Sequence, residues 1–246
     1  MPDWLIGCSG FHYPEWKLLF YPEKLPQSKW FEYYCQHFNT LEVNGTFYRF
    51  PNAAFLQKWY SKSPASFQFS VKVPRLITHY KQFIETERML GDFYASIYEG
   101  LQEKLACVLF QLPERAVFSE ERLNRISNSV DPSFTNVIEF RHESWWQQSV
   151  YQELAKHSII FCSQSHPKLP DSVIQHLPIV YYRFHGVPTL YKSQYQKKQL
   201  QHIVDEISQP GHVKQAYIYF NNTMGMAGIR NAKQTEAYSR LTDKQG

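Results

Sequence analysis

Three apolar segments of this sequence each end in two polar residues spaced two positions apart. The pairs are Glu42 with Asn44, Glu139 with Arg141, and Arg183 with His185. Alternate residues of a strand point to the same face, so each pair would share one face of its strand. A carboxylate inside an apolar strand is costly to bury unless a polar partner lies nearby. The repeated arrangement predicts that separate strands contribute charged side chains to a common site.

Further polar residues lie at or just beyond the ends of predicted strands. They are Tyr48, Lys72, His79, Gln111, Asn221 and Asn222. Fixed cations outnumber acids in the combined set, which predicts an anionic ligand carrying phosphate or carboxylate. Arg141 and Arg183 could bind such a ligand bidentately. Aromatic residues near the same strand ends could stack a base or sugar; they are Trp16, Tyr48, Trp145 and Tyr191.

Strand-like and helix-like segments alternate along the chain. Apolar or alternating runs predict strands at 5–8, 41–44, 67–73, 105–112, 136–140, 159–162, 179–184 and 216–220. Apolar spacing and end signals predict helices at 29–37, 53–62, 85–103, 119–130, 150–156, 171–176, 194–208 and 229–241. Residues 77–80 are expected in a loop, and residues 163–167 in the loop after the sixth strand.

Eight alternating units predict an α/β fold with a parallel sheet, closed as a single (β/α)8 TIM barrel. An open doubly wound sheet is the competing fold. That fold usually carries a Gly-rich phosphate turn after its first strand, and Cys8-Ser9-Gly10-Phe11 is not such a turn. No composition shift marks a boundary, so one domain over residues 1–246 is expected.

A series of short motifs is spread along the chain. In order they are Gly7-Cys8-Ser9-Gly10-Phe11, Trp16, Phe20-Tyr21-Pro22, Glu42-x-Asn44-x-Thr46-Phe47-Tyr48, Trp59, Lys72, Thr78-His79, Phe110-Gln111-Leu112-Pro113, Glu139-Phe140-Arg141-His142-x-Ser144-Trp145, Tyr182-Arg183-Phe184-His185-Gly186 and Tyr219-Phe220-Asn221-Asn222. This set, in this order, resembles the YecE-like family, called domain of unknown function 72. The match extends from about Leu5 to Ala232. The resemblance implies a TIM barrel and implies no particular activity.

The chain departs from the family pattern in two places. Phe11 stands where the family usually has Trp, so an indole donor is missing there. Many members carry an Asp after the sixth strand, where this chain offers Ser163, Gln164 or Ser165. Any role of that acid in chemistry or in metal binding would be missing here.

Composition limits the class of protein. The hydrophobic fraction of 43% allows a large core, and the 17% of aromatic residues are expected mainly to pack within it. A net charge of +4 permits an acidic partner without requiring one. Cys8, Cys35, Cys107 and Cys162 lack metal-ligand spacing and are expected to be free thiols in a reducing compartment.

The start of the chain enters a strand directly, without the basic and apolar regions of a signal peptide. No apolar run approaches about 18 residues, so no membrane span is expected. The sequence therefore predicts a cytoplasmic protein with no membrane partner and no obligate protein partner. No cofactor is predicted. A divalent metal held by His185, Glu139, Glu42 and His79 is an alternative, although the neighbouring cations would repel it.

The favoured hypothesis is an enzyme, most simply a hydrolase, that uses acid/base chemistry on a phosphate-bearing or nucleic-acid-derived anion. Glu42 or Glu139 would be the general base and His185 its acid partner. The residues expected to bind substrate are Asn44, Tyr48, Lys72, His79, Gln111, Arg141, Trp145, Arg183, Asn221 and Asn222.

Two other functions fit the same residues. Glu42 and Glu139 lie three strands apart and could serve a glycoside hydrolase, although the cations suit only an acidic sugar. The protein could instead be a non-enzymatic nucleic-acid or anion-binding module. Surface residues offered for that role are Lys192, Lys197 and Lys198 with Tyr191 and Tyr195.

Overall fold

The computed structural model describes residues 2–209 and 211–242. Over these residues, eight strands follow one another in sheet order and close into a barrel, which confirms the predicted fold class. The strands are β1 (Asp3–Cys8), β2 (Thr40–Val43), β3 (Gln68–Lys72), β4 (Leu105–Gln111), β5 (Asn136–Glu139), β6 (Ile160–Ser165), β7 (Ile179–Phe184) and β8 (Gln215–Phe220).

In the described part of the chain an α-helix follows each strand except β6, which is joined to β7 without one. The α-helices are α1 (Trp30–Cys35), α2 (Ala53–Lys62), α3 (Glu87–Leu101), α4 (Glu120–Ser129), α5 (Gln148–Lys156), α6 (Lys197–Ser208) and α7 (Ala227–Thr242). Two helix starts follow sequence signals directly. The side chain of Asn52 accepts a hydrogen bond from the backbone of α2, and Ser119 does so for α4.

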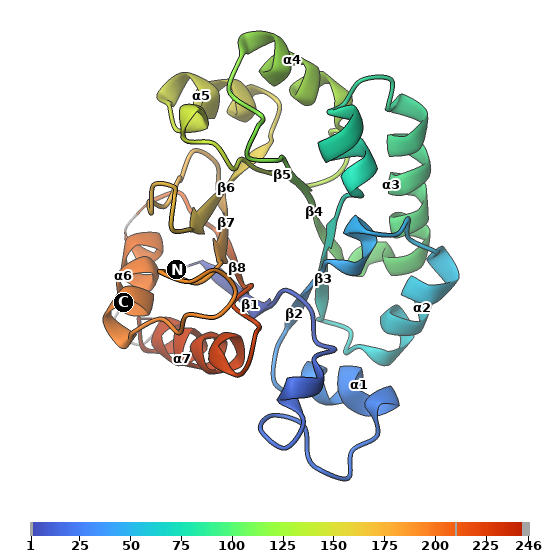
Figure 1. Cartoon of the computed structure of the whole chain (residues 1–246), viewed down its shortest axis with the longest axis vertical. Helices are drawn as coiled ribbons and strands as arrows, with labels where there is room; N and C mark the ends of the chain where they lie inside the picture. The colour runs from blue at the N-terminus through green and yellow to red at the C-terminus, as the bar shows by residue number, and fades with distance from the viewer. Residues whose placement is uncertain (1, 210, 243–246) are drawn as a thin grey trace. The chain divides into compact units, whose positions relative to one another are not determined.

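The chain divides into two compact units. The first unit contains the described residues up to Glu42 and from Ser163 onward, and the second contains Val43–Cys162. In the first unit α7 lies against β1 and beside α6; in the second, α2 lies beside α3 (Figure 1). The single domain expected over residues 1–246 stays a prediction, and Met1, Pro210 and residues 243–246 lie outside the described residues.

The strands of both units are buried on both faces, as expected of parallel strands covered by helices. In β4, the run Cys107–Phe110 has no exposed surface, and β3, β4 and β5 pair in parallel. In the first unit, β7, β8 and β1 pair in parallel over their full length. Within each unit, the polar residues at the carboxyl ends of these strands therefore follow buried apolar runs.

Two predicted elements are wrong. Residues 77–80, expected in a loop, belong to a π-helix over Leu76–Lys81. Residues 171–176, expected to be helical, form no helix. There, Ile174 N donates to Ser163 Oγ at 2.8 Å, and the Asp171 carboxylate accepts from the Tyr182 hydroxyl. The NH of Ile174 is thus satisfied by a side chain of β6 in place of a helical carbonyl.

Two polar stretches also lie differently from the prediction. β2 ends at Val43, and Asn44 has helical backbone angles (φ −92°, ψ −15°) at the start of the 3-10 helix Gly45–Phe47. Asn44 therefore does not share a strand face with Glu42. β6 continues through Ser163, Gln164 and Ser165, which are buried strand residues rather than loop residues.

Gly100 allows α3 to approach α2 closely. A Cβ atom at Gly100 would lie 2.5 Å from Leu56 Cβ and 3.1 Å from the Ala53 carbonyl oxygen, both in α2. Gly91, in the same helix, has nothing within 4 Å of the corresponding position. The two glycines thus have opposite environments within one helix.

We expect Gly100→Ala to destabilise the protein by about 1–3 kcal/mol, because the added methyl group overpacks the contact between the helices. Gly91→Ala is expected to stabilise it by about 0.5–1 kcal/mol, because alanine favours the helical backbone. Urea denaturation of both variants measures the difference. Equal effects of the two substitutions would contradict the close approach of α2 and α3.

Candidate functional site

In the second unit, three predicted site residues are the last residues of adjacent strands. Lys72 ends β3, Gln111 ends β4 and Glu139 ends β5. Gln111 and Glu139 are register partners, and Lys72 pairs with Leu109, two residues before Gln111. The carboxyl end of a barrel strand is where TIM-barrel enzymes place their active sites.

The polar groups at these strand ends contact one another. Lys72 Nζ donates to Gln111 Oε1 at 2.5 Å, and Arg141 Nη2 lies 2.7 Å from Glu139 Oε1. Glu139 is fully buried, whereas Lys72 and Arg141 keep 8% and 9% of their surface exposed. Glu139 and Arg141 are therefore paired, although β5 ends at Glu139 and Arg141 lies beyond the strand whose face they were predicted to share.

His79 lies beside these cations. Its Nδ1 is 2.9 Å from Thr78 Oγ1, and its backbone carbonyl accepts a hydrogen bond from Arg115 Nη2 at 2.8 Å. Burial, and after it the charges of Lys72, Arg115 and Arg141, together lower the pKa of His79 from 6.5 to about 4, against a smaller raising effect of the Glu139 carboxylate. At neutral pH the imidazole is therefore uncharged.

We call this group the cationic cluster; it consists of Lys72, His79, Gln111, Arg115, Glu139 and Arg141. Lys72, Arg115 and Arg141 carry positive charge, and Glu139 is the one acid of the group. A half-buried site with surplus positive charge favours an anion, and guanidinium groups match phosphate or carboxylate geometry. An uncharged imidazole beside the anion can accept a proton.

In the first unit, Glu42 forms a buried ion pair. Arg183 Nη2 lies 2.6 Å from Glu42 Oε1, and the Tyr181 hydroxyl donates to Glu42 Oε2 at 2.8 Å. All three side chains are fully buried. Both carboxylate oxygens therefore have a partner within the unit. This arrangement favours a role for Glu42 and Arg183 in holding the barrel together over a role in contacting substrate.

His185 and the two asparagines after β8 lie in the same unit. His185 Nδ1 is 3.0 Å from Asn221 Nδ2, and the His185 ring packs edge-on against His166 with centroids 5.9 Å apart. His185 is fully buried and Asn221 is half-buried. Asn222 Nδ2 donates to Ser193 O and Asn231 Oδ1 at 2.9 and 3.1 Å. Asn222 thus ties the chain after β8 to α7.

The aromatic residues expected to stack a ligand differ in whether they are buried or exposed. Trp145 is fully buried, with its indole NH donating to Ala116 O at 2.7 Å and its ring stacked on Phe140. Trp16 is buried too, and its indole NH donates to Gly225 O at 2.8 Å. Neither tryptophan offers a face to a ligand, because each is part of the core. Tyr48 is 71% exposed.

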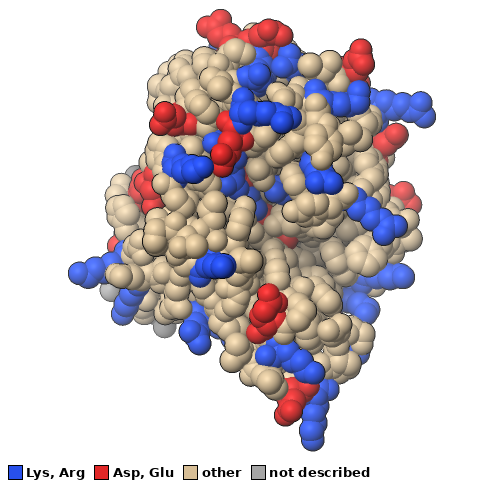
Figure 2. Space-filling view, viewed as in Figure 1, with Lys and Arg blue, Asp and Glu red and all other residues tan. Residues whose placement is uncertain are grey.

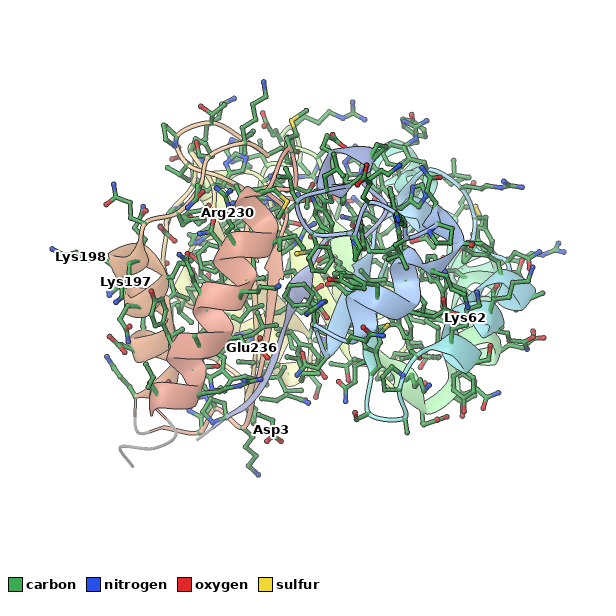
Figure 3. All side chains as sticks on the ribbon, turned by 90° about the horizontal axis from the view of Figure 1, so that it is seen from below. Asp3, Lys62, Lys197, Lys198, Arg230 and Glu236 are labelled. Carbon is green, nitrogen blue, oxygen red and sulfur yellow. The ribbon has the colours of Figure 1, made fainter. Side chains whose placement is uncertain are left out.

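The surface patch proposed for nucleic-acid binding also loses one of its aromatic residues. Tyr195 is buried; its hydroxyl donates to Ser165 O at 3.4 Å and accepts from Gly186 N at 2.8 Å. Lys197 and Lys198 lie at the first turn of α6 (Figure 3), and Lys197 Nζ is 5.6 Å from the centre of the Tyr238 ring. On the face shown in Figure 2, basic side chains are distributed among acidic ones.

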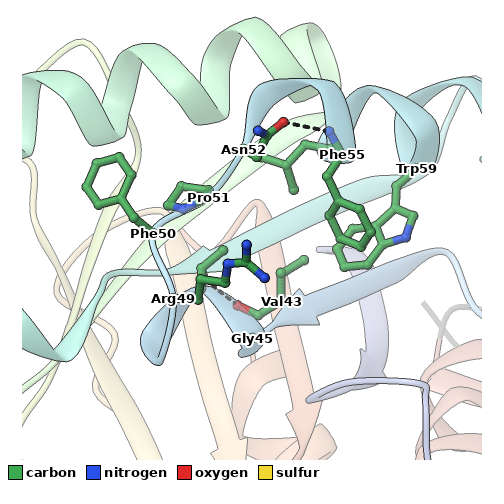
Figure 4. Close-up of a pocket in the computed structure, with 10 residues that line it drawn as sticks. Val43, Gly45, Arg49, Phe50, Pro51, Asn52, Phe55 and Trp59 are labelled. Atoms are coloured by element: carbon green, nitrogen blue, oxygen red, sulfur yellow. Dashed lines mark hydrogen bonds between the residues drawn. The ribbon is translucent and has the colours of Figure 1, made fainter.

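A separate cavity of about 390 Å³ lies beside the chain that follows β2 (Figure 4). Phe50, Phe55 and Trp59 line it with other apolar groups, and Arg49 is the charged residue of its lining. None of the predicted site residues lines this cavity. It is an apolar site with chemistry different from that of the cationic cluster.

Sequence reasoning missed two residues that complete these arrangements. Arg115 follows β4 by four residues and adds a third cation beside His79. Tyr181, two residues before Arg183, supplies the second hydrogen bond to Glu42. The spacing of two that singled out Arg183 and His185 also includes Tyr181, so this signal was available for Tyr181 and not for Arg115.

Among residues 2–209 and 211–242, no three His, Cys, Asp or Glu side chains come together as a ligand set for a metal ion. The four cysteines are free thiols, as expected, and Cys35 is the one that is not fully buried. None of the helices in the described part of the chain combines the length and the apolar character needed to cross a bilayer.

Comparison with known families agrees with the fold. The family model described as "Protein of unknown function DUF72" matches residues 5–245. The chain belongs to the DUF72 family. The resemblance to the YecE-like family drawn from the sequence motifs is confirmed. A crystal structure of a DUF72 family protein from Thermotoga maritima MSB8 is similar, with a TM-score of 0.85, 27% identity, and coverage of 98% of this chain and 99% of that chain.

Two further relatives are more distant or partial. A DUF72 family protein from Enterococcus faecalis V583 shares the fold, with a TM-score of 0.79, 19% identity, and coverage of 97% of this chain and 96% of that chain. UPF0759 protein YunF of Bacillus subtilis (strain 168) is 30% identical over 140 residues, which is 54% of this DUF72 chain. The match spans half the length of that curated relative.

We expect Arg183→Met to destabilise the protein by about 3–5 kcal/mol, because the substitution leaves the buried Glu42 carboxylate without its arginine. Tyr181→Phe removes one hydrogen bond from the same carboxylate and is the matched control, expected to cost about 1 kcal/mol. Guanidinium denaturation measures both. A smaller loss for Arg183→Met than for Tyr181→Phe would contradict the importance of the ion pair.

The lowered pKa of His79 predicts a pH-dependent stability. As pH falls from 6.5 towards 4, the unfolded chain protonates His79 before the folded protein does, so this residue's contribution to stability is lost over that range. His79→Asn should therefore show a shallower fall in unfolding free energy between pH 6.5 and pH 4 than the parent protein. NMR titration of the imidazole measures the pKa directly, and a value near 6.5 would contradict the prediction.

Proposed function

We propose that this protein binds a phosphate-bearing anion at the cationic cluster and hydrolyses it by acid/base chemistry. The observation that carries the proposal is the surplus of positive charge at the carboxyl ends of β3 to β5. Lys72, Arg115 and Arg141 converge on His79 strongly enough to help hold it uncharged. A phosphate group would balance this charge.

The residues of the cationic cluster have different roles in the proposed reaction. Lys72 and Arg141, each with a small exposed fraction, would hold the phosphate oxygens and stabilise the charge that develops in the transition state. Gln111 orients the Lys72 ammonium, and Glu139 orients the Arg141 guanidinium. Water would attack phosphorus as the ester P–O bond breaks. One proton of the water would stay on the phosphate, and the other would pass through the proton acceptor to the departing oxygen, giving free phosphate and an alcohol.

Two groups in the cluster could accept the proton of the attacking water. Glu139, predicted as a general base, is held in an ion pair with Arg141. His79 is uncharged at neutral pH and half-buried, so we assign the proton acceptor to His79 and the positioning of Arg141 to Glu139. Glu42 and His185, proposed at first as base and acid, are buried in the first unit, and their catalytic role stays a prediction.

Phosphate binding tests the proposal first. Lys72→Met is expected to weaken binding of inorganic phosphate about 10- to 100-fold, because it removes a charge-assisted hydrogen bond of about 1.5–3 kcal/mol. Lys58→Met, on the exposed surface of α2, is the control and should leave the affinity unchanged. Titration calorimetry at two salt concentrations gives the affinities. Failure of the parent protein to bind phosphate at millimolar concentration would refute the proposal.

Turnover tests the hydrolase. We expect the parent protein to cleave a chromogenic phosphate ester, and His79→Gln and Glu139→Gln to reduce the rate by at least 100-fold, with the melting temperature as a check on folding. Phosphate binding without cleavage of phosphomonoesters or phosphodiesters would favour a non-enzymatic anion-binding module. Cleavage of chromogenic glycosides that depends on Glu42 and Glu139 would favour the glycoside hydrolase instead.

A further inference from the structure

Two tyrosines and an arginine form an exposed group in the second unit. Tyr48 is 71% exposed and Tyr80 is 61% exposed. The guanidinium carbon of Arg75 lies 5.5 Å from the centre of the Tyr48 ring and 5.6 Å from the centre of the Tyr80 ring. We call these three residues the aromatic platform. Large aromatic rings left in water at one place commonly mark a binding surface.

The aromatic platform is continuous with the cationic cluster through Phe47. The Phe47 ring packs edge-on against Tyr48, with centroids 5.1 Å apart, and against His79, with centroids 5.0 Å apart. Lys72 Nζ lies 4.1 Å from the centre of the same ring. Two ring contacts therefore separate the exposed Tyr48 from the uncharged imidazole, and Tyr80 directly follows His79 in the chain.

The backbone that carries Tyr80 and His79 has an unusual conformation. The π-helix Leu76–Lys81 is followed by left-handed φ angles at Gln82 (47°), Phe83 (65°) and Glu85 (50°), none of which is glycine. Such conformations cost energy and are concentrated at functional sites. Here they are held by neighbouring groups: Phe83 is buried, and Arg125 Nε donates to Gln82 O at 3.2 Å. The segment thus presents both residues from a fixed support.

We propose that the aromatic platform and the cationic cluster together bind a nucleoside phosphate unit. The planar base stacks on the exposed faces of Tyr48 and Tyr80, and the phosphate lies at Lys72 and Arg141. Arg75 adds a cation that can stack with the base or pair with a neighbouring phosphate. This inference rests on the proposed function, because it assigns the group attached to the phosphate.

The combination of features favours a nucleoside over other phosphate esters. A sugar phosphate would use the cations but would leave the two exposed tyrosine faces without a planar partner. Each of the nucleobases has a π face that can stack on tyrosine. The unit could be a free mononucleotide or part of a single strand of nucleic acid, because both present the same base and phosphate.

Titration of the full chain with four probes tests the inference: inorganic phosphate, ribose 5-phosphate, adenosine 5′-monophosphate and a short single-stranded oligoadenylate. We expect adenosine 5′-monophosphate to bind about tenfold more tightly than ribose 5-phosphate, since stacking on one aromatic side chain is worth about that factor. Tighter binding of the oligoadenylate than of the mononucleotide would identify a single strand as the source, and the reverse order a free nucleotide.

Substitutions of the two tyrosines test whether the aromatic platform is where the base binds. Tyr48→Leu and Tyr80→Leu should each reduce the affinity for adenosine 5′-monophosphate about tenfold while leaving that for inorganic phosphate unchanged. Tyr80→Phe keeps the ring and should bind like the parent protein. Tyr98→Leu, on α3 and 60% exposed, is the matched control and should have no effect. Melting temperatures establish that each variant is folded.

The outcomes separate this inference from the proposed function. If phosphate binds in a Lys72-dependent manner but the mononucleotide binds no more tightly than ribose 5-phosphate, the platform assignment is overturned and the anion site survives. If the tyrosine variants bind the mononucleotide as the parent does, the platform assignment is likewise overturned. If neither phosphate nor nucleotide binds, the proposed function itself fails.

Discussion

Glu42 and Glu139 are carboxylates removed from water, and each is accommodated by an arginine within 2.7 Å. A buried charge without a partner would cost about 3–5 kcal/mol, a large part of the net stability of a typical protein. The requirement acts on both units: Arg183 and Tyr181 satisfy Glu42 in the first, and Arg141 satisfies Glu139 in the second. These contacts constrain which strand residues can be charged and where their side chains must point.

The two units meet this requirement to different extents. In the first unit the pair of Glu42 and Arg183 is balanced and sealed from solvent, which suits a structural role. In the second unit Glu139 is outnumbered by cations, and the nearby His79 stays uncharged at neutral pH. A cluster in which three cations accompany one carboxylate and an uncharged imidazole has the charge that favours binding of an anion. The functional proposal therefore depends on the second unit.

Aromatic residues of this protein occupy two different environments, the core and the exposed surface. Trp16 and Trp145 complete the core and have their indole NH groups satisfied by backbone carbonyls. Tyr48 and Tyr80, in contrast, are exposed, and both rings lie beside the guanidinium of Arg75. Composition alone cannot separate these groups, since the hydrophobic gain from burying a ring is available to all of them. The packing around each ring determines whether that ring is buried or exposed.

By itself, the sequence determined the barrel, its strands and the polar strand ends Lys72, Gln111 and Glu139, because period-two patterns and apolar runs are local properties. It could not determine that Asn44 leaves the strand, that residues 76–81 form a π-helix, or that Arg115 reaches His79. Those outcomes depend on partners distant in the chain. Tertiary structure alone decided which charged side chains pair with one another, because pairing is set by distances between segments and not by their order in the sequence.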